Sequence, residues 1–532
     1  MIVIHNFRMA LEDETPLATA AAKRLGLKEG DIQQVRIVRR AVDARRKPHI
    51  SFVHTLQVET AMEKAVSKKF RHDRDVVLGV PKERPPILLG TTPLKGRPVV
   101  VGLGPAGLFA ALALARQGYR PLVLERGRDV ERRSQDVADF WQTGRLNPAS
   151  NVQFGEGGAG TFSDGKLTTR VNHPRMQELL EIMAAAGAPP EIVYLHKPHV
   201  GTDLLRLVVK NLREEIKHLG GEVRFEHQVT DLKVTDGRVV AVEINGAERE
   251  GCAAVLLGIG HSARDTYAML QARGVAMETK PFAIGLRIEH PQELLDQAQY
   301  GAAAGHPRLG AADYALVYHH PSNGRTAYSF CMCPGGLVIA SASEEGGVVT
   351  NGMSLYSRAS GFANSALVVN VLPEDHDGTP LGGVSFQRQW EQAAFAAGGG
   401  GYAAPAQAVG DFLQGSNGKT EFLTAPSYRP GIKRTQLRDC LPAFVGDTLR
   451  QALPDFGRKI KGFDHPGAVL TGVETRTSAP LRILRGRDFQ SLTLQGLYPL
   501  GEGAGYAGGI MSAALDGYMA ALSLMEAYGP PH

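Results

Sequence analysis

The sequence predicts a multidomain α/β protein organised around one Rossmann-like dinucleotide-binding domain. Residues 98–127, PVVVGLGPAGLFAALALARQGYRPLVLERG, have the pattern of a buried strand, a glycine turn, a helix and a second strand. The length of 532 residues exceeds what one hydrophobic core supports, so two or three domains are expected. The composition, 43% apolar and 21% charged, is typical of a globular protein in water.

The glycine turn in this stretch has the spacing that binds a dinucleotide. Gly102, Gly104 and Gly107 follow the apolar run 99–101 as G-x-G-x-x-G. The first glycine permits the tight turn, the second lets a pyrophosphate approach the backbone, and the third lets helix and strand pack closely. Glu125 ends the second strand, where a carboxylate can accept hydrogen bonds from a ribose. Because strand, helix and acid all lie where this chemistry requires them, we prefer a dinucleotide site over an ordinary β–α–β crossover.

Residues 1–80 predict a ferredoxin-like α+β domain with the order βαββαβ. Thr15 and Pro16 supply a helix start, and Gly26 follows the helix end. The proline-rich residues 81–97 predict a semi-rigid linker. The expected elements are a strand at 2–9, a helix at 15–25, strands at 32–38 and 49–58, a helix at 59–70 and a strand at 75–78.

The positive charge of the chain is concentrated in its first part. Residues 1–98 contain 19 Lys and Arg against 11 Asp and Glu, although the whole chain has a net charge of only +5. An acidic protein partner, RNA and a solvated basic face are all open interpretations. We favour the solvated face, because aromatic residues that could stack on bases are not interleaved with the charges. The basic residues concerned are Arg36, Arg39, Arg40, Arg45, Arg46 and Lys47.

The remainder of the chain divides into the dinucleotide-binding domain, residues 98–280 and 466–532, and an insertion, residues 281–465. We expect the insertion to be a mixed, mainly antiparallel α+β substrate domain. Within the first domain, residues 151–170 are a glycine-rich loop. Its other expected elements are helices at 130–145, 174–187, 202–219 and 510–525, a three-stranded meander at 222–225, 229–235 and 239–244, and a buried strand near 253–260. In the insertion we expect strands near 282–291, 314–318, 326–332, 337–342 and 366–371, and helices near 385–396 and 405–412.

Five segments occur in an order that resembles a known family. They are QFGEGGAGTFSDGKL, GHSARDTY, FAIGLRIEHP, CMCPGG and GEGAGYAGGI. Together they resemble bacterial FAD-dependent dehydrogenases or oxidoreductases within the glutathione-reductase-type FAD superfamily, a family whose physiological substrate is not established. The resemblance covers essentially the whole chain. It implies FAD as the cofactor and a glutathione-reductase-type FAD-binding domain, but it implies no particular reaction.

The resemblance also assigns cofactor roles to individual residues. The family motif that binds the ribityl chain usually has Gly-Asp, whereas this chain has Gly501-Glu502, so the role of Glu502 in detail is in question. The last helix opens beside the flavin, where its N-terminus can stabilise negative charge. The implied FAD contacts are Gly102, Gly104, Pro105, Ala106 and Gly107 for the pyrophosphate; Glu125 and Arg126 for the AMP ribose; Val229 for the adenine; Gly258 and Gly260 for a second glycine turn; Gly157, Gly158, Thr161, Ser163 and Asp164 in the loop that passes over the flavin; and Gly501, Glu502, Gly503, Ala504, Gly508, Gly509 and Ile510 near the ribityl chain and the flavin.

Four side chains are candidates for catalysis. Cys331 and Cys333 could exchange electrons with a flavin, although C-x-C lacks the usual C-x-x-C spacing and two cysteines of a strand core are the alternative. His261 could act as a general acid or base, or only as an interdomain hydrogen-bond partner. Lys166 could stabilise the anionic reduced flavin or a substrate carboxylate, or form a salt bridge that fixes its loop. Histidines and cysteines show no metal-ligand spacing, and we predict no metal.

These observations predict an FAD-dependent oxidoreductase that transfers a hydride between an unidentified small molecule and noncovalently bound FAD. A second G-x-G-x-x-G after a strand is missing, so NAD(P)H, if it is the donor, is expected to bind transiently in the substrate cleft. The alternative is an FAD-containing RNA-associated or redox-regulatory protein that docks through its basic N-terminal domain. Four scattered cysteines and the absence of a signal-peptide pattern lead us to expect a cytoplasmic location.

Overall fold

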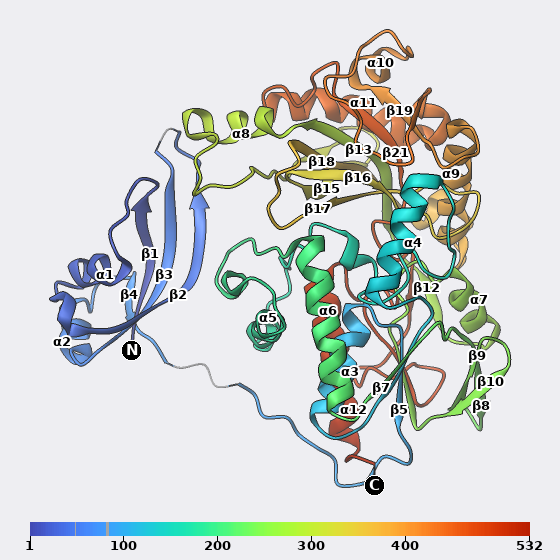
Figure 1. The fold of residues 1–532 in the computed structure, drawn as a ribbon, viewed down its shortest axis with the longest axis horizontal. Coiled ribbons are helices and arrows are strands. Elements are labelled where there is room, and N and C mark those ends of the chain that lie inside the picture. The colour runs from blue at the N-terminus through green and yellow to red at the C-terminus, as the bar shows by residue number, and fades with distance from the viewer. Residues whose placement is uncertain (48, 81–83, 532) are drawn as a thin grey trace.

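The computed structural model describes residues 1–47, 49–80 and 84–531 (Figure 1). It is a mixed α/β structure with several sheets, and three of these organise the chain. We call the part around the four-stranded sheet the N-terminal unit, the part around the five-stranded parallel sheet the parallel-sheet unit, and the part around the seven-stranded sheet the seven-stranded unit. Figure 1 shows the N-terminal unit at the left and the seven-stranded sheet above the helices α3, α6 and α12. Residues 81–83 of the predicted linker lie outside the described residues.

The N-terminal unit has the order of elements that the sequence predicts. Its four strands form one sheet in the order β2-β3-β1-β4. Gly26 ends the first helix with φ 67°, as expected, but Pro16 rather than Thr15 occupies the position before the helix. The second strand is five residues longer than predicted, because Arg39 and Arg40 continue its pairing with the third strand. The elements are β1 (Ile2–Ala10), α1 (Leu17–Leu25), β2 (Ile32–Asp43), β3 (Ser51–Thr60), α2 (Glu63–Lys69) and β4 (Val76–Leu78).

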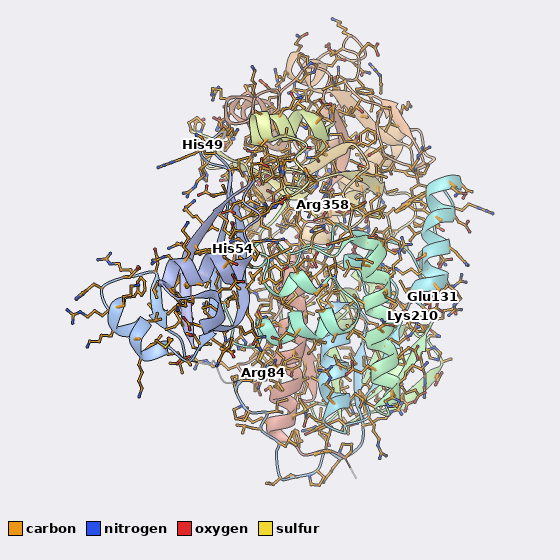
Figure 2. All side chains as sticks on the ribbon, turned by 60° about the vertical axis from the view of Figure 1, so that its left-hand side comes forward. His49, His54, Arg84, Glu131, Lys210 and Arg358 are labelled. Atoms are coloured by element: carbon orange, nitrogen blue, oxygen red, sulfur yellow. The ribbon has the colours of Figure 1, made fainter. Side chains whose placement is uncertain are left out.

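The N-terminal unit is bound to the rest of the chain by its basic strand. The amide of Arg40 donates to the carbonyl of Tyr194 over 2.8 Å, and the amide of His196 donates back to the carbonyl of Arg40 over 2.8 Å. Arg308 donates to the carbonyl of Leu11 over 2.6 Å. Figure 2 shows this junction from the side, with His49 and His54 labelled on the N-terminal unit. Two further basic residues contact the rest of the protein: Arg39 contacts His196, and Lys47 donates to the carbonyl of Ala298. Within the N-terminal unit, Arg8 and Arg45 both pair with Asp43.

The parallel-sheet unit contains five parallel strands in the order β23-β11-β5-β6-β7. Residues 222–225, predicted as the first strand of an antiparallel meander, instead form the edge strand β7, parallel to β6. The prediction is wrong because a strand of only four residues has the same pattern in parallel and antiparallel sheets. The five strands are β5 (Pro98–Val101), β6 (Leu122–Glu125), β7 (Glu222–Phe225), β11 (Ala254–Leu257) and β23 (Leu497–Pro499).

Helices cover one face of the parallel sheet, and a three-stranded antiparallel sheet covers the other. Helices α3 and α12 touch so closely that a Cβ at Gly517 would lie 1.9 Å from the carbonyl oxygen of Ala106. This contact joins the first glycine turn to the last helix of the chain. The covering elements are α3 (Pro105–Arg116), α5 (Met176–Ala185), α6 (Gly201–His218) and α12 (Ile510–Ala527) on one side, and β8 (Val229–Thr235), β9 (Arg238–Ile244) and β10 (Glu248–Gly251) on the other; α4 (Val130–Thr143) and α7 (Arg264–Ala272) complete the unit.

The seven-stranded unit is built on a sheet with the order β14-β15-β18-β13-β21-β19-β20. Residues 469–474, assigned by sequence to the dinucleotide-binding domain, form β21 and pair with β13 and β19. The predicted helix 405–412 is half wrong: residues 404–408 form a strand, and helix α10 begins at Val409. The strands are β13 (Phe282–Pro291), β14 (Val317–His319), β15 (Thr326–Cys333), β18 (Phe362–Val371), β19 (Ala404–Ala408), β20 (Ile432–Arg434) and β21 (Val469–Glu474).

Four helices surround this sheet, and two of them, α8 and α11, have no counterpart in the sequence prediction. Two short strand pairs, β16 with β17 and β12 with β22, complete the structure. Among the described residues, no helix is both long and apolar enough to cross a membrane. The remaining elements are α8 (Gln292–Tyr300), α9 (Gly382–Gly398), α10 (Val409–Gln414), α11 (Ala443–Lys459), β12 (Met277–Thr279), β16 (Gly336–Ala340), β17 (Thr350–Ser354) and β22 (Leu481–Ile483).

Candidate functional site

A cavity of about 350 Å³ lies between the carboxyl end of the parallel sheet and strands of the seven-stranded sheet. The carboxyl end of a parallel sheet is where ligands bind in open α/β structures, because loops and helix N-termini converge there. All five parallel strands deliver residues that follow them to this cavity. These residues are Gly102, Gly104, Pro105 and Ala106 after β5, Glu125 and Arg126 at the end of β6, His227 and Val229 after β7, Gly258 to Ser262 after β11, and Leu500 and Glu502 after β23.

The first glycine turn is shaped by close backbone contacts. Gly102 has φ +89°, and a Cβ on it would lie 2.4 Å from the carbonyl oxygen of Gly258. A Cβ on Gly107 would lie 1.9 Å from the carbonyl oxygen of Gly102. Gly107 does not line the cavity; it lets α3 approach the turn. These two glycines therefore permit packing, whereas Gly104, which lines the cavity, leaves room for a ligand.

Glu125 connects the glycine turn to the glycine-rich loop. Its buried carboxylate accepts a hydrogen bond from the amide of Leu103 over 2.7 Å, and two more from the amides of Gly127 and Gly155 over 2.9 and 3.0 Å. We predicted that this carboxylate binds a ribose; in the structure it fixes three backbone segments at the cavity. Arg126 beside it stacks on the ring of Phe154, 4.3 Å from the centroid.

The loop of residues 151–170 is held by one buried guanidinium, that of Arg133. It donates to five main-chain carbonyls of the loop, at distances from 2.5 to 3.3 Å. Burial lowers the pKa of Arg133 to about 10. Because five carbonyls converge on one side chain, the loop has a fixed shape over the glycine turn. The carbonyls belong to Asn151, Val152, Gly155, Glu156 and Gly158.

Asp164 and Lys166 lie where this loop meets the seven-stranded unit. The buried carboxylate of Asp164 accepts from the Nε of Arg358 over 2.9 Å and from the hydroxyl of Ser354. The Nζ of Lys166 is 3.9 Å from the Asp164 carboxylate and 29% of its side chain is exposed. Both residues line the cavity. Asp164, predicted as a cofactor contact, is therefore also the anchor between the two units; Arg358 is labelled in Figure 2.

His261 and Glu502 form a pair at the ends of β11 and β23. The Nδ1 of His261 is 3.2 Å from a carboxylate oxygen of Glu502. The Nε2 of His261 is buried and has no hydrogen-bond partner among the described residues. Both side chains line the cavity, so Nε2 is a polar atom available to a bound group.

Cys331 lies on the opposite wall of the cavity, on β15. Cys333 is fully buried behind it. The guanidinium of Arg287, also buried, donates to the carbonyl of Cys331 over 2.9 Å and binds the carboxylate of Glu474 through two hydrogen bonds of 3.0 Å. The same guanidinium reaches Asn364 and Asn351 at 2.9 and 3.0 Å.

A second buried ionic cluster joins the two units. The carboxylate of Glu391 accepts from Arg264 over 2.7 and 2.9 Å and from Arg476 over 3.0 and 3.0 Å. Burial opposes ionisation, but the two guanidinium groups hold the pKa of Glu391 below its usual value. Arg476 also reaches Ser262 at 3.1 Å, and it lines the cavity. Sequence reasoning missed Glu391 and Arg476; a charged residue within the apolar face of α9 was the available signal.

The structure brings most of the predicted site residues to the cavity and leaves others behind it. The predicted residues that line it are Gly102, Gly104, Pro105, Ala106, Glu125, Arg126, Gly158, Ser163, Asp164, Lys166, Val229, Gly258, Gly260, His261, Cys331, Glu502, Gly508, Gly509 and Ile510. Those that do not line it are Gly107, Gly157, Thr161, Cys333, Gly501, Gly503 and Ala504; they pack under its wall. Lining residues that sequence reasoning missed include Gln153, Phe330, Glu474 and Thr477.

The donors and spaces of the cavity fit a dinucleotide. At Gly260, Gly508 and Gly509, which line it, no described atom beyond the chain neighbours lies within 4 Å of the position that a Cβ would take. A ligand can therefore approach the bare backbone at three places. The unpartnered Nε2 of His261 and the start of α12 add polar contacts. Among the described residues, no group of three or more His, Cys, Asp or Glu side chains is arranged to hold a metal ion.

Two family models match this chain. Residues 281–477 match the family described as FAD-dependent protein, C-terminal domain-like. Residues 1–59 match a domain of unknown function (DUF8436). Residues 281–477 thus match a domain of FAD-dependent proteins, the cavity fits this cofactor, and FAD as the cofactor is confirmed.

A curated relative covers the whole chain. An uncharacterized protein of Clostridium beijerinckii is 49% identical over 532 residues, which are 100% of this chain and 99% of the relative. The chain therefore belongs to the same family as that protein. Among solved structures, CtdE in complex with FAD and substrate 4 has 13% identity and a TM-score of 0.33 over 81% of each chain. The tetracycline destructase Tet(51) has 12% identity and a TM-score of 0.34 over 82% of this chain and 83% of its own. Scores this low do not establish a common arrangement.

Proposed function

We propose that the protein is an FAD-dependent oxidoreductase that transfers a hydride between FAD and a small molecule bound against the seven-stranded unit, with NAD(P)H as a transient donor. The observation that carries this proposal is the cavity with two different walls. One wall is glycine backbone and carboxylates from the parallel-sheet unit, and the other is made of side chains, among them Phe330, Cys331 and Asn351. We assign the parallel-sheet unit to the glutathione-reductase type on the order of its glycine turns, β6 acid and final helix.

When bound, FAD supplies an acceptor and donor of two electrons. The residues of the chain provide positioning, electrostatics and a place for a proton. With Nδ1 of His261 donating to Glu502, Nε2 can take up a proton from a substrate or return it. The ammonium of Lys166 favours negative charge that develops in the cavity. The Asp164–Arg358 and Glu391–Arg264 contacts hold the second wall at a fixed distance from the first.

The test is anaerobic reduction of the purified protein. We expect a visible flavin spectrum that is bleached by NADH or NADPH, or by one member of a metabolite screen, and restored by an acceptor. The His261→Asn variant should keep the spectrum and lose at least about tenfold in the rate of bleaching, because general acid–base catalysis contributes 10²–10⁴-fold. Dithionite is the control that the flavin can be reduced. A protein whose FAD is reduced by dithionite but by no nicotinamide or metabolite contradicts the proposal.

A further inference from the structure

Cys331 has a backbone conformation that is unfavourable for its residue type. Its φ is +43°, in the left-handed region. The pairing of β15 with β18 is irregular here, as in a β-bulge. Phe330 pairs with Ala366 and Cys333 with Asn364, so β15 advances three residues where β18 advances two. A residue other than glycine in this region costs on the order of 1–3 kcal/mol and persists only where its surroundings impose it. The strain falls on a residue that lines the cavity.

The surroundings that impose this conformation are built around the two cysteines. The guanidinium of Arg287 binds the carbonyl of Cys331 at 2.9 Å and is itself fixed by Glu474. On the other side, a Cβ at Gly352 would lie 2.8 Å from the sulfur of Cys333 and 2.4 Å from Nη1 of Arg287. Only a glycine fits there, so the cluster closes tightly on the Cys333 thiol.

The two thiols are neighbours with unequal acidity. The Cys333 sulfur is 3.3 Å from the Cys331 carbonyl oxygen. A hydrogen bond from the Cys333 thiol and the charge of Arg287 lower the pKa of Cys331, with Lys166 adding to the effect. The same hydrogen bond and burial raise the pKa of Cys333. Cys331 is thus the more acidic thiol, at the cavity, and Cys333 is the less acidic thiol behind it, the asymmetry that thiol–disulfide exchange uses.

We propose that Cys331 and Cys333 form a dithiol–disulfide couple that exchanges an electron pair with FAD, so that the substrate class of this site is a small disulfide or dithiol. The inference rests on the proposed function, since it uses the same cavity and the same cofactor. This inference goes beyond the proposed function because it places a second two-electron carrier, the cysteine pair, on the wall opposite the glycine turn.

The exchange balances as follows for a small external disulfide. The Cys331 thiolate attacks one sulfur of the substrate, its S–S bond breaks, and one thiolate leaves. The Cys333 sulfur, giving up its proton, attacks the Cys331 sulfur, an intramolecular S–S bond forms, and the second substrate thiol leaves. The substrate has gained two electrons and the Cys333 proton, its first thiolate takes a proton from water, and the cysteine pair has lost two electrons. Reduced FAD would supply two electrons, and with one proton these would return the pair to the Cys331 thiolate and the Cys333 thiol.

Anaerobic titration of the holoprotein with dithionite tests this couple. After mild oxidation, the wild type should accept about twice as many electrons per FAD as the Cys331→Ser variant or the Cys333→Ser variant. The reason is that FAD is the only two-electron acceptor left in each variant. Cys252→Ser is the matched control, since Cys252 is a half-buried cysteine outside the cavity. It should behave as the wild type does.

Thiol labelling of the wild type gives a second readout that needs no variant. The oxidised and the dithionite-reduced holoprotein are each unfolded in the presence of a maleimide, which labels free thiols. The reduced protein should be labelled at all four cysteines and the oxidised protein at only two. Peptide mapping should show that the two unlabelled cysteines are Cys331 and Cys333. If FAD is bound but oxidation hides no cysteine and the uptake equals that of Cys331→Ser, the couple is contradicted and the proposed function stands. A protein that holds no FAD would contradict the proposed function instead.

Discussion

The two walls of the cavity are built by different means. On the parallel-sheet side, glycines place the backbone next to the ligand, and Glu125 uses its carboxylate to hold amides. On the seven-stranded side, long charged side chains meet in dry clusters, Arg287 with Glu474 and Arg476 with Glu391. The glycine turn and Glu125 of the first wall are close in sequence, whereas the ion pairs of the second wall join residues more than 80 positions apart. The first can bind a common cofactor by shape, and the second can hold a specific arrangement of reactive groups.

The largest expected effect comes from breaking the second wall. Arg287→Met should lower the free energy of unfolding by about 3–5 kcal/mol, because it leaves the buried Glu474 without a counter-charge. The measurement is denaturant unfolding of both proteins at one FAD concentration. The folded fraction should still bind FAD, since the glycine wall is untouched.

Arg482→Met is the control for that variant. Arg482 also pairs with an acid, Glu278, over 3.2 Å, but both side chains are exposed, at 38% and 49%. Its loss should cost at most about 1 kcal/mol. If both variants lose the same stability, the second wall is not held by its buried ion pairs.

A buried carboxyl next to the first wall should give the protein a pH dependence of intermediate size. Burial raises the pKa of Glu156 to about 7, although Arg213 favours the charged form. The folded protein then keeps a proton that the unfolded chain releases, so the contribution of Glu156 to the free energy of unfolding is greatest below about pH 4.5 and falls by about 3 kcal/mol as pH rises to about 7. Unfolding measured across this window should show a flatter profile for Glu156→Gln. Identical profiles would mean that Glu156 is ionised throughout in the folded protein.

The smallest of the three effects on stability should come from the first wall itself. Gly107→Ala should cost about 2–3 kcal/mol, because its Cβ would lie 1.9 Å from the carbonyl oxygen of Gly102 and α3 must move outward. That movement displaces the turn, so FAD content after purification should fall well below that of the wild type. Gly251→Ala is the control, since no described atom beyond the chain neighbours lies within 4 Å of its Cβ position. Full FAD content in Gly107→Ala would show that the turn does not need this glycine.

These two walls also explain how far the sequence could predict the structure. The first wall was predictable, because a strand, three glycines, a helix and Glu125 lie within thirty residues and each type has one physical role there. The order of elements in residues 1–80 follows from patterns of the same short range. Strand β7 and the start of β19 were not predictable, since segments of four or five residues do not indicate which strand they pair with.

The second wall was beyond sequence reasoning for a related reason. Arg287, Asn351, Asn364 and Glu474 come from four strands, and only the fold brings them to the same place. Cys331 and Cys333 were noticed as a pair, but the left-handed turn at Cys331 and its link to Arg287 leave no mark in the sequence. Binding of RNA by the N-terminal unit stays a prediction. Several basic residues of this unit already contact other residues of the same protein.

The contact between α3 and α12 sets an order of events during synthesis. The glycine turn at 102–107 emerges early, but Gly508 to Ile510, which complete the wall beside it, follow about 400 residues later. Units generally begin to fold as they leave the ribosome. The N-terminal unit and much of the seven-stranded sheet can therefore form while the parallel sheet still lacks β23 and α12. The cofactor cavity is therefore complete only after α12 has formed, so a truncation that removes α12 should yield a largely folded protein without its flavin.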